Sequence, residues 1–120
     1  MKASLLIDRT LLDEVTREAR ENPRQRKNRN FHQGDAAIAH RLLNAIEPGS
    51  YLAPHRHLDA NKDETIVVLR GRLAVFFFDD DGNVRQTVVL SPLGAVCGVN
   101  IPHGEYHTVL ALDPGTVMLE

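Results

Sequence analysis

Apolar residues recur at helical spacing near the start of the chain, over residues 8–21, with charged residues between them. Asp8 or Thr10 can cap the first turn of such a helix. Pro23 disfavours the helical conformation of the residue before it, so we expect the helix to end there. The pattern predicts one amphipathic helix, whose apolar positions are Leu11, Leu12, Val15 and Ala19.

After residue 35 the chain changes to short apolar runs separated by Gly, Pro, Asp and Asn. Short, evenly spaced runs of this kind favour an all-β sandwich or barrel over alternating βαβ units. The acidic, glycine-containing stretch at 79–83 predicts a hairpin turn. The predicted strands are residues 38–46, 51–55, 65–70, 73–78, 84–90, 95–101, 106–112 and 116–119.

Residues 24–32, between the helix and the strands, are basic and polar and have no useful periodicity. We expect a connecting segment there. The chain then divides into an N-terminal part, residues 1–34, and a barrel, residues 35–120. At 120 residues the two parts suit one structural domain with one core.

Several predicted strands are apolar on both faces. Within residues 65–70, Ile66 and Val68 lie on one face, while Val67 and Leu69 lie on the other. The helix can cover one outer patch, and a second copy of the barrel can cover another, so we expect a homodimer. The alternative is that the two sheets and the helix suffice.

The net charge and the composition argue against several classes of function. The formal net charge of −2 gives no overall attraction to nucleic acid or to anionic membranes. A single cysteine, Cys97, forms no intrachain disulfide, and no apolar run is long enough to span a membrane. The apolar run that ends at Asp8 is only three residues long, too short for a signal peptide. We expect a cytoplasmic protein with no nucleic-acid or membrane partner.

Two histidines, His55 and His57, stand two positions apart. Residues two apart on a strand point to the same side, so both imidazoles can enter one cavity and reach one ion. Exposed histidines at this spacing also arise by chance, and the context decides between the two readings. Glu64 follows after a loop, and a turn with Pro102 precedes His107.

The order Gly-x5-His-x-His, Glu-x6-Gly and Pro-x-Gly-x2-His resembles the two signature motifs of the cupin superfamily. The resemblance implies a double-stranded β-helix, a jelly-roll-like barrel. It also implies one divalent metal ion inside the barrel. The loop of residues 58–63 is longer than the usual cupin spacing. Matching the motifs residue by residue gives the metal ligands His55, His57, Glu64 and His107.

Residues 22–27, 30–32 and 41–49 resemble the WbuC-type cupin-fold metalloproteins. That resemblance implies a role in bacterial surface-polysaccharide metabolism. We therefore expect a metal-dependent enzyme that acts on a small, carbohydrate-derived molecule. The alternative is a non-catalytic, metal-stabilised module that binds a sugar or an anion, since one fold hosts both kinds of function. A metal-free sugar-nucleotide epimerase is disfavoured, because those relatives lack this ligand set.

Three imidazoles and one carboxylate suit Fe, Mn, Ni, Co or Zn, and the sequence does not choose among them. Octahedral coordination would leave open positions for isomerase or oxygenase chemistry, while a closed tetrahedral zinc site would indicate a structural role. No general base can be assigned, so the catalytic residues are unknown.

The basic segment offers candidate substrate-binding residues. Guanidinium and ammonium groups suit phosphate oxygens, and an anionic sugar is the ligand they would fit. A solvated basic loop is the simpler interpretation. The candidates are Arg26, Lys27 and His32. We expect Asp59, Asp63 and His103 to be solvated loop residues and His40 to be structural or exposed.

Overall fold

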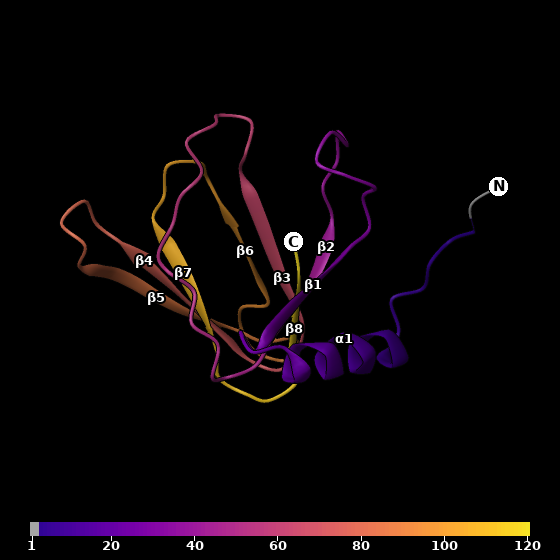
Figure 1. Cartoon of the computed structure of the whole chain (residues 1–120). Helices are drawn as coiled ribbons and strands as arrows, with labels where there is room; N and C mark the ends of the chain where they lie inside the picture. Colours follow the sequence, from indigo (N-terminus) through magenta and orange to yellow (C-terminus); the bar gives the residue numbers. More distant parts are fainter. Residues whose placement is uncertain (1–2) are drawn as a thin grey trace.

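The computed structural model describes residues 3–120, which form one helix and two antiparallel sheets (Figure 1). Residues 1–2, the first two of the predicted N-terminal part, lie outside the described residues. The sheets have the strand orders β1-β2-β8-β3-β6 and β5-β4-β7. This architecture confirms the predicted all-β class with one N-terminal helix. The elements are α1 (Arg9–Glu21), β1 (Arg26–Asn30), β2 (Leu42–Ile46), β3 (Glu64–Arg70), β4 (Leu73–Phe78), β5 (Val84–Leu90), β6 (Gly98–Ile101), β7 (His107–Ala111) and β8 (Thr116–Leu119).

Helix α1 forms as the sequence predicts. The Asp8 side chain caps its start by accepting a hydrogen bond from the backbone N–H of Leu11 at 2.9 Å. The helix ends at Glu21, before Asn22 and Pro23. Its apolar face packs on the outer face of the larger sheet (Figure 1), which confirms that the helix covers one outer patch. This outer core contains Leu11, Val15, Ala19, Leu43, Ala45 and Val117.

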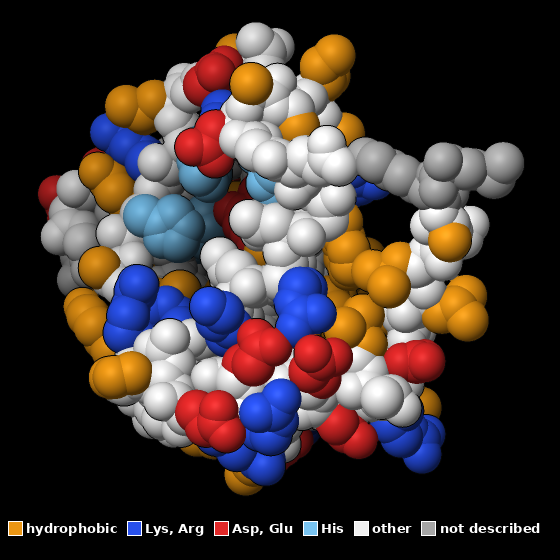
Figure 2. Space-filling model, turned by 45° about the vertical axis from the view of Figure 1, so that its right-hand side comes forward, with side chains coloured by type: hydrophobic (Ala, Val, Ile, Leu, Met, Phe, Trp, Pro, Cys, Tyr) orange, Lys and Arg blue, Asp and Glu red, His pale blue; other side chains and the backbone are white. Residues whose placement is uncertain are grey.

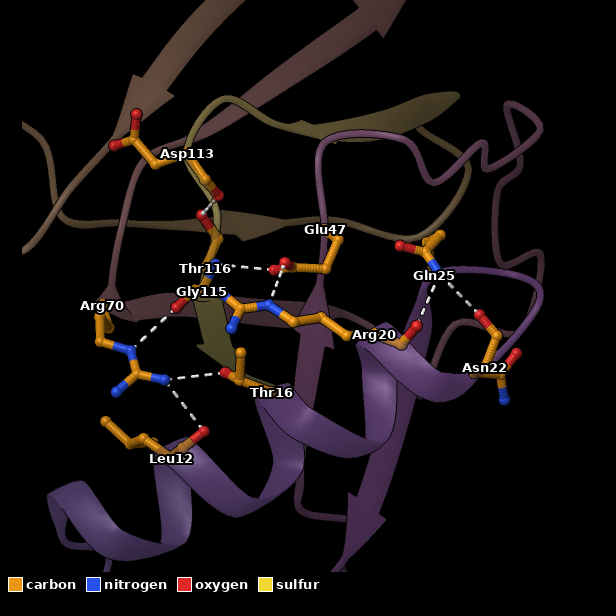
Figure 3. Close-up of polar contacts among 10 residues, drawn as sticks. All are labelled: Leu12, Thr16, Arg20, Asn22, Gln25, Glu47, Arg70, Asp113, Gly115 and Thr116. Atoms are coloured by element: carbon orange, nitrogen blue, oxygen red, sulfur yellow. Dashed lines mark hydrogen bonds and ion pairs between the residues drawn. The ribbon is translucent and has the colours of Figure 1, made fainter.

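Two groups of polar contacts, made by Arg70 and by Glu47, fix the helix to the sheet (Figure 3). Arg70, at the end of β3, donates from Nη2 to the carbonyl of Leu12 at 3.0 Å and to Oγ1 of Thr16 at 2.8 Å. Glu47 is buried and accepts from Nε of Arg20 and from the backbone N–H of Gly115, both at 2.7 Å. The helix therefore has a defined position, because a buried carboxylate without partners would be costly.

The prediction of a connecting segment over residues 24–32 is wrong for Arg26–Asn30, which form strand β1. This strand pairs antiparallel with β2, from Arg26 opposite Ile46 to Asn30 opposite Leu42. It is the edge of the five-stranded sheet and has no fully buried residue, so its sequence lacks the alternation that marks a half-buried strand. β1, from the predicted N-terminal part, thus pairs with a strand of the predicted barrel. The division of the chain into residues 1–34 and 35–120 stays a prediction.

The main core lies between the two sheets. Ile66 and Val68 of β3 face inward and are buried. On β4, Phe77 faces the same core while Phe76 and Phe78 are only half-buried, as expected for alternate rings on opposite faces. The outer face of the smaller sheet leaves apolar side chains exposed, among them Val89 and Leu110. The predicted homodimer stays a prediction.

Most predicted strands appear, with shifted ends. The hairpin turn at 79–83 is confirmed, with the N–H of Asp79 donating to the carbonyl of Asn83 at 2.9 Å between β4 and β5. The strand predicted over 38–46 begins only at Leu42, and the one over 51–55 is wrong except for a single bridge at His55.

Candidate metal centre

The first two predicted ligands, His55 and His57, are held by backbone contacts with the second motif. His55 and His107 exchange two backbone hydrogen bonds, of 3.0 and 2.9 Å, in an isolated antiparallel bridge. The N–H of Gly104 donates to the carbonyl of His57 at 2.6 Å. The positive φ of Gly104, 85°, explains why a glycine stands in this turn. These contacts bring the His-x-His segment beside the start of β7.

All four predicted ligands meet at this place. The donor atoms of His55, His57 and Glu64 lie within 4.8 Å of one another. Nε2 of His57 is 3.6 Å and Nε2 of His107 is 3.1 Å from Oε2 of Glu64. The rings of His55 and His107 are 4.5 Å apart between centroids. The cluster is partly open to solvent, because His55 and His57 are exposed while His107 is 2% exposed.

Backbone carbonyls orient two of the imidazoles. Nδ1 of His107 lies 2.9 Å from the carbonyl of Glu105, and Nδ1 of His55 lies 3.2 Å from that of Ala53. A carbonyl only accepts, so each Nδ1 carries the proton and each Nε2 is the nitrogen left for a metal. Nε2 of His107 faces the carboxylate of Glu64, a position that either a proton or a metal ion can fill.

The donor set therefore fits a divalent metal ion. Imidazole nitrogen and carboxylate oxygen are ligands that Fe, Mn, Ni, Co and Zn accept. The rings are already directed by second hydrogen bonds, as ligating histidines usually are. The hydrogen bond between His107 and Glu64 would give way when both turn to one ion.

A second carboxyl group, which the sequence analysis missed, lies against the cluster. Burial works to raise the pKa of Glu64, but side-chain hydrogen bonds with His107 and Glu120 outweigh it and lower the pKa. Burial, together with the hydrogen bond and the negative charge of Glu64, raises the pKa of Glu120. The two carboxyl groups thus have pKa values shifted in opposite directions. The alternation of Thr116, Met118 and Glu120 along β8 was the only available signal for this inward position.

A pocket of about 690 Å³ opens beside the cluster. In Figure 2 histidine side chains surround a hollow in the surface, with acidic atoms inside it. The pocket reaches two of the predicted ligands, His57 and Glu64, and also Glu120. Its remaining wall comes from the loops before β2 and β3 and from the first residues of these strands, through Asp35, Ala37, Ile38, His40, Leu42, Asn61, Lys62, Asp63 and Thr65.

The long loop of residues 58–63 is tied to the second motif. Oδ1 of Asp63 accepts from the backbone N–H of His103 at 2.9 Å and lies 3.0 Å from its Nδ1. The backbone hydrogen bond, followed by the side-chain one, lowers the pKa of Asp63. Asp63 and His103 bind each other at the surface, and neither belongs to the cluster of donor atoms.

The candidate substrate-binding residues lie elsewhere. Arg26 donates from Nη1 to the carbonyl of Tyr51 at 3.0 Å and to Oγ of Ser50 at 3.3 Å. Lys27 is exposed on the edge strand. His32 stacks on His40, with ring centroids 4.1 Å apart. None of these three candidates lines the pocket beside Glu64, and their role in binding stays a prediction.

Solved structures share this fold. KdgF from Halomonas sp. is 18% identical with a TM-score of 0.63, and the match covers 82% of this chain and 78% of that one. A cupin-2 domain-containing protein from Shewanella frigidimarina is 24% identical with a TM-score of 0.56, covering 78% and 76%. A conserved protein of unknown function from Streptococcus pyogenes has a TM-score of 0.63 at 14% identity, covering 99% and 87%. Together with the two facing sheets, these similarities define a small protein of the cupin fold.

Sequence comparison gives the family. The model of the family described as Domain of unknown function (DUF6016) matches residues 7–90, and the chain belongs to that family. Among curated proteins no match is found. The resemblance to WbuC-type proteins stays a prediction. Within residues 3–120, α1 is too short and too polar to cross a membrane, and no other helix is present.

Proposed function

We propose that this protein is a metal-binding cupin in which His55, His57, Glu64 and His107 hold one divalent ion, Fe, Mn, Ni, Co or Zn. The observation that carries the proposal is the convergence of the four side chains. Three donor atoms lie within 4.8 Å of one another, and Nε2 of His107 is 3.1 Å from the carboxylate of Glu64. They come from segments far apart in the sequence, which a chance pair of surface histidines would not explain.

The chain's own residues would orient the metal and its ligand. The carbonyls of Ala53 and Glu105 fix two imidazoles through Nδ1, and Glu120 lines the same pocket as Glu64. A bound metal ion would supply a Lewis acid at the edge of the pocket. The pocket beside His57 and Glu64 is large enough for a small molecule.

We further propose that the site acts on a small, carbohydrate-derived molecule, in the manner of a metal-dependent isomerase or oxygenase. The open side of the cluster supports catalysis over a purely structural metal, because a closed structural site would leave no position for a substrate. The link to surface-polysaccharide metabolism is supported by the sequence resemblance to WbuC-type proteins.

The test is metal analysis of untagged protein. We expect close to one metal ion per chain, and almost none in a double His55→Ala, His57→Ala variant. His32→Ala is the matched control, since it removes an imidazole outside the cluster. Stoichiometric metal in the double variant would show that these histidines are not ligands.

A further inference from the structure

One buried polar atom near the cluster has no partner. Asn44, in the middle of β2, is 7% exposed, and within residues 3–120 its Oδ1 is the one buried side-chain N or O atom without a hydrogen bond. Its neighbours Leu43 and Ala45 face the helix, so Asn44 faces the space between the sheets. An unpaired buried acceptor is costly and calls for an explanation, such as a bound ligand or water.

The amide nitrogen of Asn44 contacts a residue that lines the pocket. Nδ2 of Asn44 is 3.5 Å from Oε2 of Glu120, a long hydrogen bond. Glu120 is held beside β2 by two backbone hydrogen bonds with Leu42, of 2.9 and 3.0 Å. Its side chain lines the same pocket as Glu64 and His57. Glu120 therefore forms part of the pocket wall next to the metal ligands, and Asn44 lies behind it, outside the pocket lining.

The chemistry of this wall selects a kind of ligand group. The carboxyl group of Glu120 offers an acceptor to an incoming molecule. Glu64 lies against Glu120, so an anionic group placed here would be repelled. A neutral hydroxyl can donate a hydrogen bond without bringing further negative charge.

We propose that Glu120, positioned by Asn44, binds a hydroxyl group of the small molecule that the pocket takes beside the metal. The inference rests on the proposed metal site and narrows its substrate class to hydroxylated molecules. Glu120 contacts the ligand, and Asn44 acts through Glu120. Neither residue belongs to the cupin motifs of the sequence.

Three related carboxylates that differ in their hydroxyl groups test the proposal: glycerate, lactate and propionate. Each would be titrated into zinc-loaded, ¹⁵N-labelled protein, with the Asn44 side-chain amide resonance as the signal. We expect glycerate to bind about tenfold more tightly than lactate, the gain of one hydrogen bond to a charged group. Propionate should bind weakest. In Glu120→Ala the ratio of the glycerate affinity to the lactate affinity should fall to about one.

Two further variants separate binding from a structural role. Asp35→Asn is the matched control, because it changes another acidic side chain of the same pocket and should leave the ratio unchanged. Asn44→Leu should lower the ratio of the glycerate affinity to the lactate affinity as Glu120→Ala does. Because this variant lacks the Asn44 amide signal, its two affinities would be measured by calorimetry. Asn44→Leu should also raise the thermal midpoint, because it removes an unpaired buried polar group.

The outcomes separate the two proposals. Normal zinc content in Glu120→Ala with an unchanged ratio of glycerate to lactate would overturn the hydroxyl subsite and leave the metal centre standing. Equal affinity of the wild type for glycerate and lactate would also overturn the hydroxyl subsite and leave the metal centre standing. Failure of the wild type to bind zinc or any other divalent ion would overturn the metal centre, and with it the subsite.

Discussion

Nε2 of His107 lies 3.1 Å from Oε2 of Glu64, although 43 positions separate the two residues in the chain. Glu64 begins β3 of the five-stranded sheet, and His107 begins β7 of the three-stranded sheet. An ion held by both residues would therefore connect the two sheets at the loop end of the barrel. Metal binding and folding should be coupled.

This coupling predicts that metal raises stability. At a free metal concentration a hundred times the Kd, the free energy of unfolding should increase by about 2.7 kcal/mol. The gain should disappear in His57→Ala. Urea unfolding with and without metal measures the difference. An equal gain in His57→Ala would mean that metal stabilises the protein from another place.

Metal affinity should depend on pH. Imidazole nitrogens bind metal only when unprotonated, and histidine in model peptides has a pKa of roughly 6.5. Affinity should therefore be highest above pH 7 and fall steadily as protons compete below pH 6. Competition with a chelator at several pH values measures it. Affinity that stays constant down to pH 4.5 would contradict coordination by three histidines.

Glu47 should be important for stability but not for metal binding. Its buried carboxylate accepts from Arg20 and from the N–H of Gly115 (Figure 3), far from the cluster. Glu47→Ala leaves the buried N–H of Gly115 without a partner, so we expect a loss of about 2 kcal/mol in unfolding free energy. Metal content per folded chain should not change.

The control for this prediction is Glu21→Ala on α1, the helix that Glu47 contacts through Arg20. Glu21 pairs with Arg17 at 3.5 Å, but both side chains are more than half exposed. Such surface pairs contribute little, so the change should be at most about 0.5 kcal/mol. Similar losses in the two variants, measured by urea unfolding, would show that the buried contacts of Glu47 are not the cause.

Gly71 should tolerate no side chain. It has a φ of 79°, and a Cβ atom there would lie 2.3 Å from Oγ1 and 2.8 Å from Cα of Thr116. Gly82 also has a positive φ, 86°, but its Cβ would meet nothing within 4 Å. We expect Gly82→Ala to cost about 1 kcal/mol from backbone strain alone, and Gly71→Ala about 3 kcal/mol or more. Equal costs in thermal unfolding would refute the steric argument.

Arg26 and Lys27 should behave differently, although the sequence suggests the same role for both. Arg26→Ala removes hydrogen bonds to Ser50 and Tyr51 and should cost about 1 kcal/mol. Lys27→Ala should leave stability unchanged because Lys27 is exposed on an edge strand. Lys27 is therefore the cleaner probe of anion binding. Calorimetry with a sugar phosphate that gives the same affinity in wild type and Lys27→Ala would remove this lysine from any anion site.

The sequence alone determined the features that depend on local pattern. The period of apolar residues predicted α1, with its cap left open between Asp8 and Thr10, and the short runs with turn residues predicted β3, β4, β5, β7 and β8. The resemblance to the two cupin motifs singled out His55, His57, Glu64 and His107, and their role as metal ligands stays a prediction. Local backbone geometry and side-chain alternation act over a few residues, so they can be read from the chain directly.

Only the tertiary structure decided what depends on distant partners. β1 has no apolar period, because an edge strand gains its place from backbone pairing with β2 rather than from burial. The hydrogen bond from Arg26 to the carbonyl of Tyr51 joins β1 to the irregular segment after β2, 25 positions away in sequence. Asn44 and Glu120 also meet, although they lie 76 residues apart in sequence. Their meeting follows from the register of β2 and β8, which is fixed by the whole sheet and not by either segment alone.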